Sequence, residues 1–517
     1  MRRAPLLACL VTLLACSTLI PTEVLVHVDA DTLSRQRARQ LHVLILDQEG
    51  VTRLDRMASL VGTPPEVELP TTVPVVPLDG DSTRTFTILA ELIDQASVAF
   101  NKKAATLSFV AQTLVDVDLY FSDLCIGIEC PTGQTCTNGV CVAFKMPPGT
   151  SVGCFNDLSL TPQEQQLIGL PADTWLDVPN THFLDFCTPN EPSGAHAVSG
   201  CLSIIKAWGG GAWDPVHAQM ILWGGGGNDY WGNEVYGFST KTFTWGLLVP
   251  GSPIGSVAPV TDPLADGTPS SRATYDGLAY LQAENRLFAF GGSELPSASS
   301  APLTWELDVE NQSWQQVDPG HTLPADTDGY FFMGTAYDGV GHRVLMRNET
   351  GVSSYDLTAN TWTRITSAGE PPLYPTWSET NYRRGVLDTK RRIFFTMGGK
   401  TSDGKPDFFA WDAVADQPVY DAWVTTGGDD IAGGVAPGAD YDAAGDALVA
   451  WSGGAARVLD PTTKQWSTMS AVGAPPAAVT NGTFGRFRYI PQYNVFVLVN
   501  RWDEDVHFYK RTAGCGP

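Results

Sequence analysis

Short apolar runs separated by glycine, proline, asparagine and aspartate dominate the pattern of this chain. The clearest example is Gly211–Trp245, which we interpret as four short strands in a row. Its apolar run, His217–Trp223, ends at four glycines, and glycine after such a run fits the end of a strand better than the interior of a helix. One unit of four short strands cannot bury both of its faces, so the pattern predicts further copies of it.

The unit recurs from about residue 208 onward. Each copy starts with an aromatic or apolar residue, usually followed by aspartate, and successive starts lie 48 to 62 residues apart. The six starts are Trp213, Tyr275, Tyr337, Leu387, Tyr441 and Tyr489. Two glycines follow the second strand in four copies, and a tryptophan ends each of the first five. Four-strand units at this period predict a β-propeller.

These residues resemble the kelch family, whose repeat has a diglycine after its second strand and a tryptophan in its fourth. The resemblance covers about residues 170–515 and implies an all-β fold with a six-bladed kelch-like β-propeller over 170–517. The sixth unit lacks a closing tryptophan, whereas Asp173–Val178 matches a fourth strand and has no unit of its own. We therefore expect this strand to complete the last blade, because an open strand edge invites aggregation. Cys515 would then lie near Cys187, and a disulfide between them would lock the ring.

Four segments precede the repeats. Residues 1–16 combine a basic start with an apolar stretch, as export signals do. Leu13–Cys16 resembles a bacterial lipobox, which implies that Cys16 is lipidated; an ordinary signal peptide that ends in cysteine is the alternative. Residues 22–120 carry alternating apolar runs that predict a small β-sandwich. A cysteine-rich joint over 121–145 resembles EGF-like knots, and 146–169 reads as a linker.

The cysteines indicate disulfides rather than a metal site. Cys125, Cys130, Cys136 and Cys141 lack the two CxxC pairs of a zinc ribbon, and an exported chain meets oxidising conditions, so we expect two local disulfides. With Cys9 removed and Cys16 acylated, eight cysteines remain, an even number that suits four disulfides. The eight are Cys125, Cys130, Cys136, Cys141, Cys154, Cys187, Cys201 and Cys515. We expect no metal and no cofactor.

The net charge of the chain limits the classes of partner that it can bind. The formal charge of −24 argues against nucleic acid and against anionic lipid headgroups. Contact with the membrane is therefore expected only through the N-terminal lipid. Ser17 rather than aspartate follows Cys16, which by the sorting rule of bacterial lipoproteins favours the outer membrane. We expect a monomer on the cell surface.

Two sets of residues are candidates for binding. Three positions before the six starts the chain reads Gly210, Arg272, Gly334, Arg384, Gly438 and Arg486. If this position begins the innermost strand, three guanidiniums would face the central mouth and attract carboxylate, sulfate or phosphate. The alternative is that each arginine pairs with a local acid.

The second set lies in one loop, where Asn228, Asp229, Tyr230 and Asn233 offer amides, an acid and an aromatic ring for a sugar. A self-capping loop is the alternative.

Signatures of catalysis are missing from the sequence. No GxSxG, HExxH or Walker-type loop occurs. Galactose oxidase shares the kelch ring, but the cysteines of the propeller region lie outside the blade interiors and there is no two-histidine cluster. We therefore predict a non-catalytic surface binding or scaffold protein with a glycan or protein partner. The alternative is a carbohydrate-active enzyme, of lyase or glycosidase type, with an arginine-lined mouth. A mouth plugged by side chains would favour the scaffold.

Overall fold

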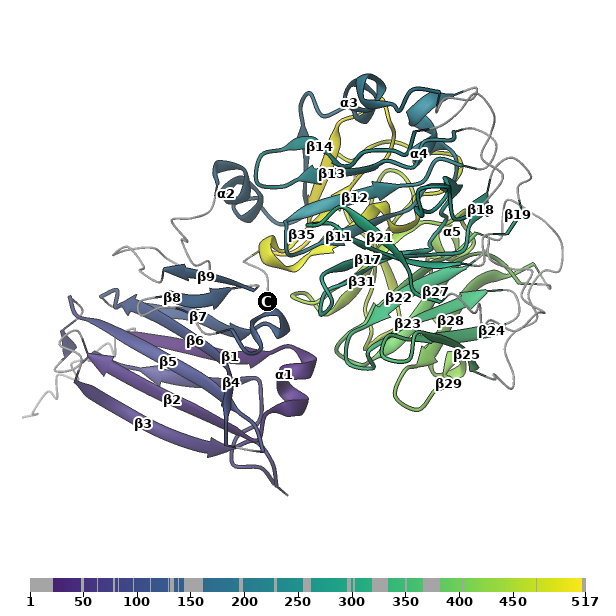
Figure 1. The fold of residues 1–517 in the computed structure, drawn as a ribbon. Coiled ribbons are helices and arrows are strands. Elements are labelled where there is room, and N and C mark those ends of the chain that lie inside the picture. Colours follow the sequence, from purple (N-terminus) through teal and green to yellow (C-terminus); the bar gives the residue numbers. More distant parts are fainter. Residues whose placement is uncertain are drawn as a thin grey trace, which may run out of the picture.

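The computed structural model contains two β-rich bodies joined near residue 160 (Figure 1). It describes residues 22–513 except 48–50, 63, 78–79, 82, 96, 112, 129, 131–133, 138, 144–160, 195–198, 227–229, 254–261, 295–298, 301–302, 319–332, 349–350, 366–381, 402–403 and 471. Strands dominate both bodies, and the described helices are short. The prediction of an all-β chain is confirmed.

The first body, purple to blue in Figure 1, consists of two sheets packed over one apolar core. One sheet has the order β3-β2-β5-β6 and the other β4-β1-β7. The strands are β1 (Glu23–Ala30), β2 (Gln40–Asp47), β3 (Thr52–Ser59), β4 (Thr71–Val75), β5 (Thr85–Ile93), β6 (Ala99–Ser108) and β7 (Leu114–Phe121), with helix α1 (Thr32–Arg37) after β1. Inward residues alternate with outward ones along β1 and β5, as two packed sheets require. We call this body the sandwich.

A hairpin of β8 (Gln134–Thr137) and β9 (Val140–Ala143) follows the sandwich. Two disulfides, Cys125–Cys136 and Cys130–Cys141, tie it to the segment before it. The cysteine-rich joint therefore holds the two local disulfides that its spacing predicts. Cys16 and Cys154 lie outside the described residues.

The second body consists of four-stranded antiparallel sheets, six of them among the described residues. Their strands, sheet by sheet, are β11 (Gly211–Asp214), β12 (Gln219–Trp223), β13 (Val235–Ser239), β14 (Thr244–Val249); β16 (Leu278–Leu281), β17 (Arg286–Phe290), β20 (Thr304–Asp308), β21 (Ser313–Gln316); β22 (Gly334–Asp338), β23 (Arg343–Asn348), β24 (Gly351–Asp356), β25 (Thr361–Ile365); β26 (Arg384–Asp388), β27 (Ile393–Lys400), β28 (Pro406–Asp412), β29 (Gln417–Pro418); β30 (Gly438–Asp442), β31 (Ala447–Trp451), β32 (Arg457–Leu459), β33 (Trp466–Thr468); and β34 (Phe487–Ile490), β35 (Val495–Leu498), β36 (Val506–Lys510), β10 (Thr174–Val178). Short helices α2 (Pro162–Ile168), α3 (Phe183–Cys187), α4 (Ser203–Lys206) and α5 (Asp429–Ala432) and a small sheet of β15 (Arg272–Ala273), β18 (Ser293–Glu294) and β19 (Ser299–Ser300) complete it.

The first strands of the six sheets contact one another in chain order, and the last of them, β34, contacts the first, β11. Apolar side chains fill the space between neighbouring sheets; Trp223 of β12, for example, packs in one cluster with Leu287 and Trp305 of the next sheet. Such strands are buried on both faces, which explains their nearly continuous apolar runs. The result is a closed, propeller-like arrangement, which we call the ring.

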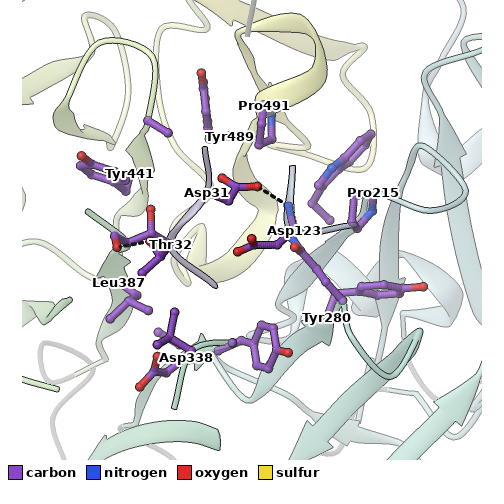
Figure 2. A pocket seen from close by; sticks show the side chains of 18 of the residues that line it. Asp31, Thr32, Asp123, Pro215, Tyr280, Asp338, Leu387, Tyr441, Tyr489 and Pro491 are labelled. Atoms are coloured by element: carbon purple, nitrogen blue, oxygen red, sulfur yellow. Dashed lines mark hydrogen bonds between the residues drawn. The ribbon is translucent and has the colours of Figure 1, made fainter. Parts of the chain in front are cut away.

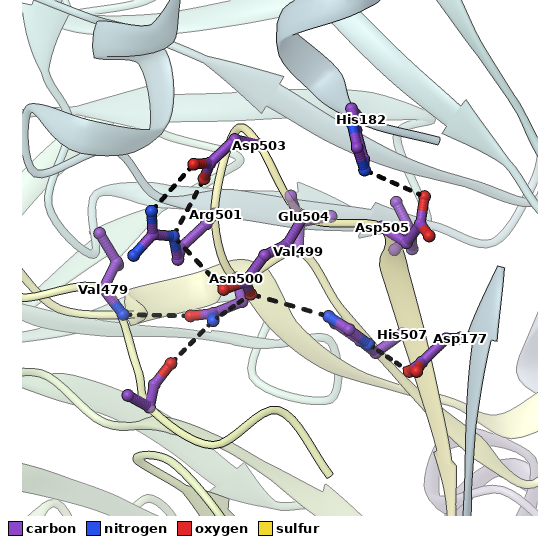
Figure 3. Close-up of polar contacts among 12 residues, drawn as sticks. Asp177, His182, Val479, Val499, Asn500, Arg501, Asp503, Glu504, Asp505 and His507 are labelled. Carbon is purple, nitrogen blue, oxygen red and sulfur yellow. Dashed lines mark hydrogen bonds and ion pairs between the residues drawn. The ribbon is translucent and has the colours of Figure 1, made fainter. Parts of the chain in front are cut away.

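Strand β10 closes the ring. It comes from the segment before the first sheet and pairs antiparallel with β36, near the end of the chain. Asp177 and His507 lie opposite each other in this pair, and Figure 3 shows them beside Asn500, Arg501 and Glu504. The expectation that Asp173–Val178 completes the last sheet therefore holds.

The expected Cys187–Cys515 disulfide is wrong. Cys187, at the end of α3, is bonded to Cys201, only 14 residues away. A turn of 3-10 helix that starts at Gly200 carries Cys201 to α3, so the bridge fastens a local loop and not the ring closure. Cys515 lies outside the described residues.

The second repeat starts five residues later than the sequence suggests. In the first sheet Trp213 lies opposite Met220, and the residue of β16 in the same place is Tyr280, opposite Leu287. Tyr275 and Asp276 precede this strand and imitate the start of a repeat. Counted from Tyr280, the aligned position is Gly277 and not Arg272, so arginine and glycine do not alternate around the ring.

Candidate binding site

A cavity of about 580 Å³ lies where the sandwich meets the ring (Figure 2). The ring side is formed by the ends of the first strands and the turns that follow them. The sandwich side is formed by the start of α1 and the end of β7. Its lining includes Asp31, Thr32, Tyr120, Asp123, Trp213, Pro215, Gln282, Ala283, Tyr337, Thr389, Asp440, Arg488 and Gln492.

Two carboxylates fix the sandwich side. The Asp123 oxygens accept the backbone N–H groups of Ser34 at 2.7 Å and Leu33 at 3.0 Å, in the first turn of α1. The Asp31 oxygens accept the Tyr120 hydroxyl and the Asp123 backbone N–H, both at 2.8 Å. The start of α1 and the segment after β7 therefore hold each other in place. Sequence reasoning missed both aspartates, because the segments that bring them together are about 90 residues apart.

Burial governs the charge of these carboxyls. It raises the pKa of Asp123 to about 6, with a further contribution from the charge of Asp31. Burial also raises the pKa of Asp31, against the bonds from Asp123 and Tyr120 that favour the ionised form. A carboxylate has about four lone-pair positions, so each group can accept further hydrogen bonds from hydroxyl donors in the cavity.

Two arginines line the ring side of the cavity, Arg392 and Arg488, of which Arg488 lies on β34. The half-buried Arg488 donates to the backbone carbonyls of Gly485, Leu278 and Gly211 at 3.1, 3.2 and 3.3 Å. Burial and the nearby charge of Arg384 lower its pKa to about 10. Direct contact between the two bodies includes the bond that Thr32 Oγ1 donates to the carbonyl of Thr389, 3.0 Å away.

Beyond the cavity, the centre of the ring is closed by an ion pair. Asp276 is fully buried and accepts from Arg384 Nη1 at 3.0 Å and from the backbone N–H groups of Thr335 and Gly385 at 2.9 and 2.7 Å. This one side chain therefore bonds to the first strands of the third and fourth sheets.

At the far end of the ring, four aromatic residues pack together: Trp208, Tyr275, Tyr382 and Phe484. Tyr275 stacks on Tyr382 with ring centroids 5.2 Å apart, and Phe484 meets Tyr275 edge-on at 5.9 Å. All four precede a first strand, at the end where the long connections arrive. The mouth that the sequence suggested as a binding site is therefore plugged.

The three predicted arginines do not face an open mouth. Arg272, Arg384 and Arg486 are each at most 1% exposed. Arg272 bonds to Asp262 at 2.7 Å, and Arg384 bonds to Asp276, so the alternative of local acidic partners holds for both. Arg486 donates to four backbone carbonyls instead, which fixes the turns around it. Nothing in this arrangement supports an enzyme with an arginine-lined mouth.

The predicted sugar loop is largely structural where it is described. Tyr230 is buried, and its hydroxyl donates to Glu234. The Asn233 amide donates to Ser252 Oγ and Thr268 Oγ1, both at 3.0 Å. Both residues are therefore structural, but Asn233 holds the connection around Ser252 and Thr268 rather than capping its own loop. Asn228 and Asp229 lie outside the described residues.

Within the described residues, no three histidine, cysteine, aspartate or glutamate side chains lie close enough together to hold a metal ion. Over those residues there is also no helix with the length and hydropathy needed to cross a membrane.

Comparisons with known proteins add little. No family model matches the chain, and no curated protein matches it. Among solved structures, part of the chain is similar to the extracellular domain of the putative one-component system BT4673 from B. thetaiotaomicron. The identity is 11% and the TM-score 0.32, over 56% of this chain and 31% of the other. The chain thus spans less than a third of the length of that structure.

Proposed function

We propose that this protein is an exported, lipid-anchored surface protein that binds a short glycan, without catalysis, in the cavity between its sandwich and its ring. In this proposal the six four-stranded sheets are the blades of a kelch-like β-propeller. Cys16 carries the lipid, the protein sits as a monomer on the outer membrane, and the sandwich holds the propeller away from the lipid surface. The three disulfides of the described residues agree with an oxidising compartment.

The cavity is the observation that carries the proposal. Its 580 Å³ falls in the range of about 300–1,000 Å³ that small-ligand sites occupy. A protein partner would instead need roughly 800 Å² of surface on each side, which a cavity of this size between two bodies does not offer. The position fits as well, since ligand sites are frequent where domains meet.

The chemistry of the lining suits a hydroxyl-rich ligand. Asp31 and Asp123 supply acceptors, Gln282 and Gln492 supply amides, and Tyr337 supplies an aromatic surface. Sugar rings offer many hydroxyl donors at their edges and an apolar face for stacking. A glycan therefore uses every kind of group that the cavity presents.

A glycan array, followed by calorimetry on each hit, tests the proposal. The protein would carry Cys16→Ser to prevent acylation. Ala283→Trp places an indole at the rim of the cavity from an exposed turn position, so we expect it to weaken binding at least tenfold without loss of fold. Ala415→Trp is the matched control, because Ala415 is equally exposed in a turn of the fourth sheet away from the cavity. Binding to no glycan, or equal affinity in both variants, would contradict the proposal.

A further inference from the structure

A buried arginine with one unused edge lies between the third and fourth sheets of the ring. Arg347 is the penultimate residue of β23, and its side chain is 0% exposed. It stands at the end of an apolar cluster that includes Leu345 and Val352 of its own sheet and Phe409 of the next. Its guanidinium lies over the Phe409 ring, 4.1 Å from the ring centroid, and this contact holds the plane of the group.

One end of the guanidinium is fully used. Nη1 donates to Thr396 Oγ1 at 2.7 Å and contacts the two Asp407 oxygens at 3.1 and 3.2 Å. Asp407 is shared, because Arg383 Nε also donates to it, at 2.8 Å. Burial on its own would raise the pKa of Asp407, but Arg347 and Arg383 together outweigh it and lower that pKa. The carboxylate is therefore ionised and held between two arginines.

The other edge of Arg347 makes no hydrogen bond to any residue that the structure describes. Nε and Nη2 are both buried there, and neither has an acceptor. These two N–H groups point in parallel from one side of the guanidinium, which is the fork that binds two oxygens of one oxyanion. A water molecule offers a single oxygen, so it matches this edge less well than a carboxylate or a sulfate does. A buried donor without an acceptor costs free energy, and a fork of two such donors calls for a bound group.

The unused edge of Arg347 lies near the long connections of the ring. Arg347 lies next to the end of β23, and Asp407 is the second residue of β28, both at the end of the ring where the long connections arrive. This is the end opposite the sandwich and its cavity. Arg272 and Arg486, by contrast, direct all three guanidinium nitrogens at acceptors within the chain. Arg384 leaves a buried Nη2 without an acceptor among the described residues, but its Nε donates to the carbonyl of Ala439, so it has one unused nitrogen and not a fork of two.

We propose that Arg347, positioned by Asp407, Thr396 and Phe409, binds an oxyanion of a ligand through its Nε and Nη2 groups. The ligand class is a carboxylate, such as that of an acidic sugar, or a sulfate or phosphate ester. This site is separate from the cavity, and the proposal does not depend on glycan binding there.

Thermal unfolding of the purified protein in acetate, glucuronate, sulfate and phosphate, against chloride at equal ionic strength, tests the assignment. Sulfate stabilises most proteins by exclusion from their surface, so the quantity to compare is the shift in Tm relative to a variant. Arg347→Gln removes the fork and leaves Asp407 with Arg383. We expect its anion-specific shift to vanish and its affinity in calorimetry to fall about tenfold or more.

One further variant keeps the test sharp. Arg286→Gln removes a more exposed arginine of the ring with the same change of charge, and it should retain the wild-type shift. Shifts with acetate and glucuronate alone identify a carboxylate site, and shifts with sulfate and phosphate alone identify a tetrahedral one. Equal anion shifts in wild type and Arg347→Gln, or a shift lost equally in Arg286→Gln, would overturn the assignment.

Discussion

Asp177 and His507 lie directly opposite each other on β10 and β36, and His507 Nδ1 is 2.6 Å from Asp177 Oδ1. The two residues are 330 positions apart in the sequence, so their contact spans the closure of the ring. Glu504 Oε2 is a second acidic neighbour, 3.9 Å from His507 Nε2 (Figure 3). Although burial opposes it, the negative charge of Glu504 and the hydrogen bond to Asp177 raise the pKa of His507 above its ordinary value.

This pair predicts a closure that weakens with rising pH. The folded state raises the pKa of His507, so protonation of this histidine adds to the free energy of unfolding. That contribution is fully present below about pH 6.5 and is lost as the pH rises through the folded pKa. The Asp177 side chain is 58% exposed, so Asp177→Asn should cost only about 0.5–1 kcal/mol at pH 6 and almost nothing at pH 9. Urea unfolding at the two pH values measures this. Asp430→Asn, which removes the partner of Arg457 instead of that of a histidine, should show equal effects at both.

The Asp276–Arg384 pair at the centre of the ring predicts a large loss of stability. Arg384→Met would leave a buried carboxylate with only backbone donors, at a cost of about 3–5 kcal/mol. Arg457→Met is the control, since its partner Asp430 is 54% exposed and the loss should stay below about 1 kcal/mol. The denaturant midpoints of Arg384→Met and Arg457→Met measure these two losses. Similar midpoints would show that the central pair contributes little to stability.

Asp123 predicts a second pH effect, in the sandwich. Here the cause is the burial of a carboxyl group and not the acidic neighbours of a histidine. The folded Asp123 pKa of about 6 lies above the ordinary value of an aspartate, so its contribution is most favourable below about pH 4 and declines as the pH rises to 6. Asp123→Asn removes this decline but also one acceptor at the start of α1. We therefore expect the Tm of the variant relative to wild type to rise between pH 4 and pH 6.5. Asp421 is exposed, so the Tm difference between Asp421→Asn and wild type should not change with pH. A Tm difference that is independent of pH in both variants would refute the effect.

The disulfide between Cys187 and Cys201 can be checked directly. Peptide mapping without reduction should recover these two cysteines in one linked fragment. Replacing both by serine should lower the free energy of unfolding by about 3 kcal/mol, as the loop of 14 residues implies. A fragment that links Cys187 to Cys515 would contradict the structure described above.

The repeats could be predicted from sequence because they are local. Each apolar run becomes a strand buried on both faces, and even the strand donated by Asp173–Val178 was visible as a fourth strand without a unit. The second repeat was misplaced because Tyr275–Asp276 imitates a start, whereas the true start, Tyr280, is followed by Leu281. That shift of five residues created the apparent alternation of arginines.

The cavity and the oxyanion fork could not be predicted in the same way. Asp31 and Asp123 become neighbours only when β1 and β7 pair, and the ring then covers them. Arg347 is one arginine in an apolar strand, and its importance depends on which of its donors other side chains leave unused. Such properties come from packing between distant segments, for which the chain carries no local pattern.

The donated strand β10 also sets the order of events when the protein is made. Its segment leaves the ribosome long before β36 exists, so it must wait for most of the remaining chain to be synthesised. Chains that stop short of Val506 keep β10 without its partner and the sheet of β34 and β35 with an open edge. Those exposed strands are open to proteolysis, whereas a finished chain hides them. Ring closure therefore distinguishes complete from incomplete chains.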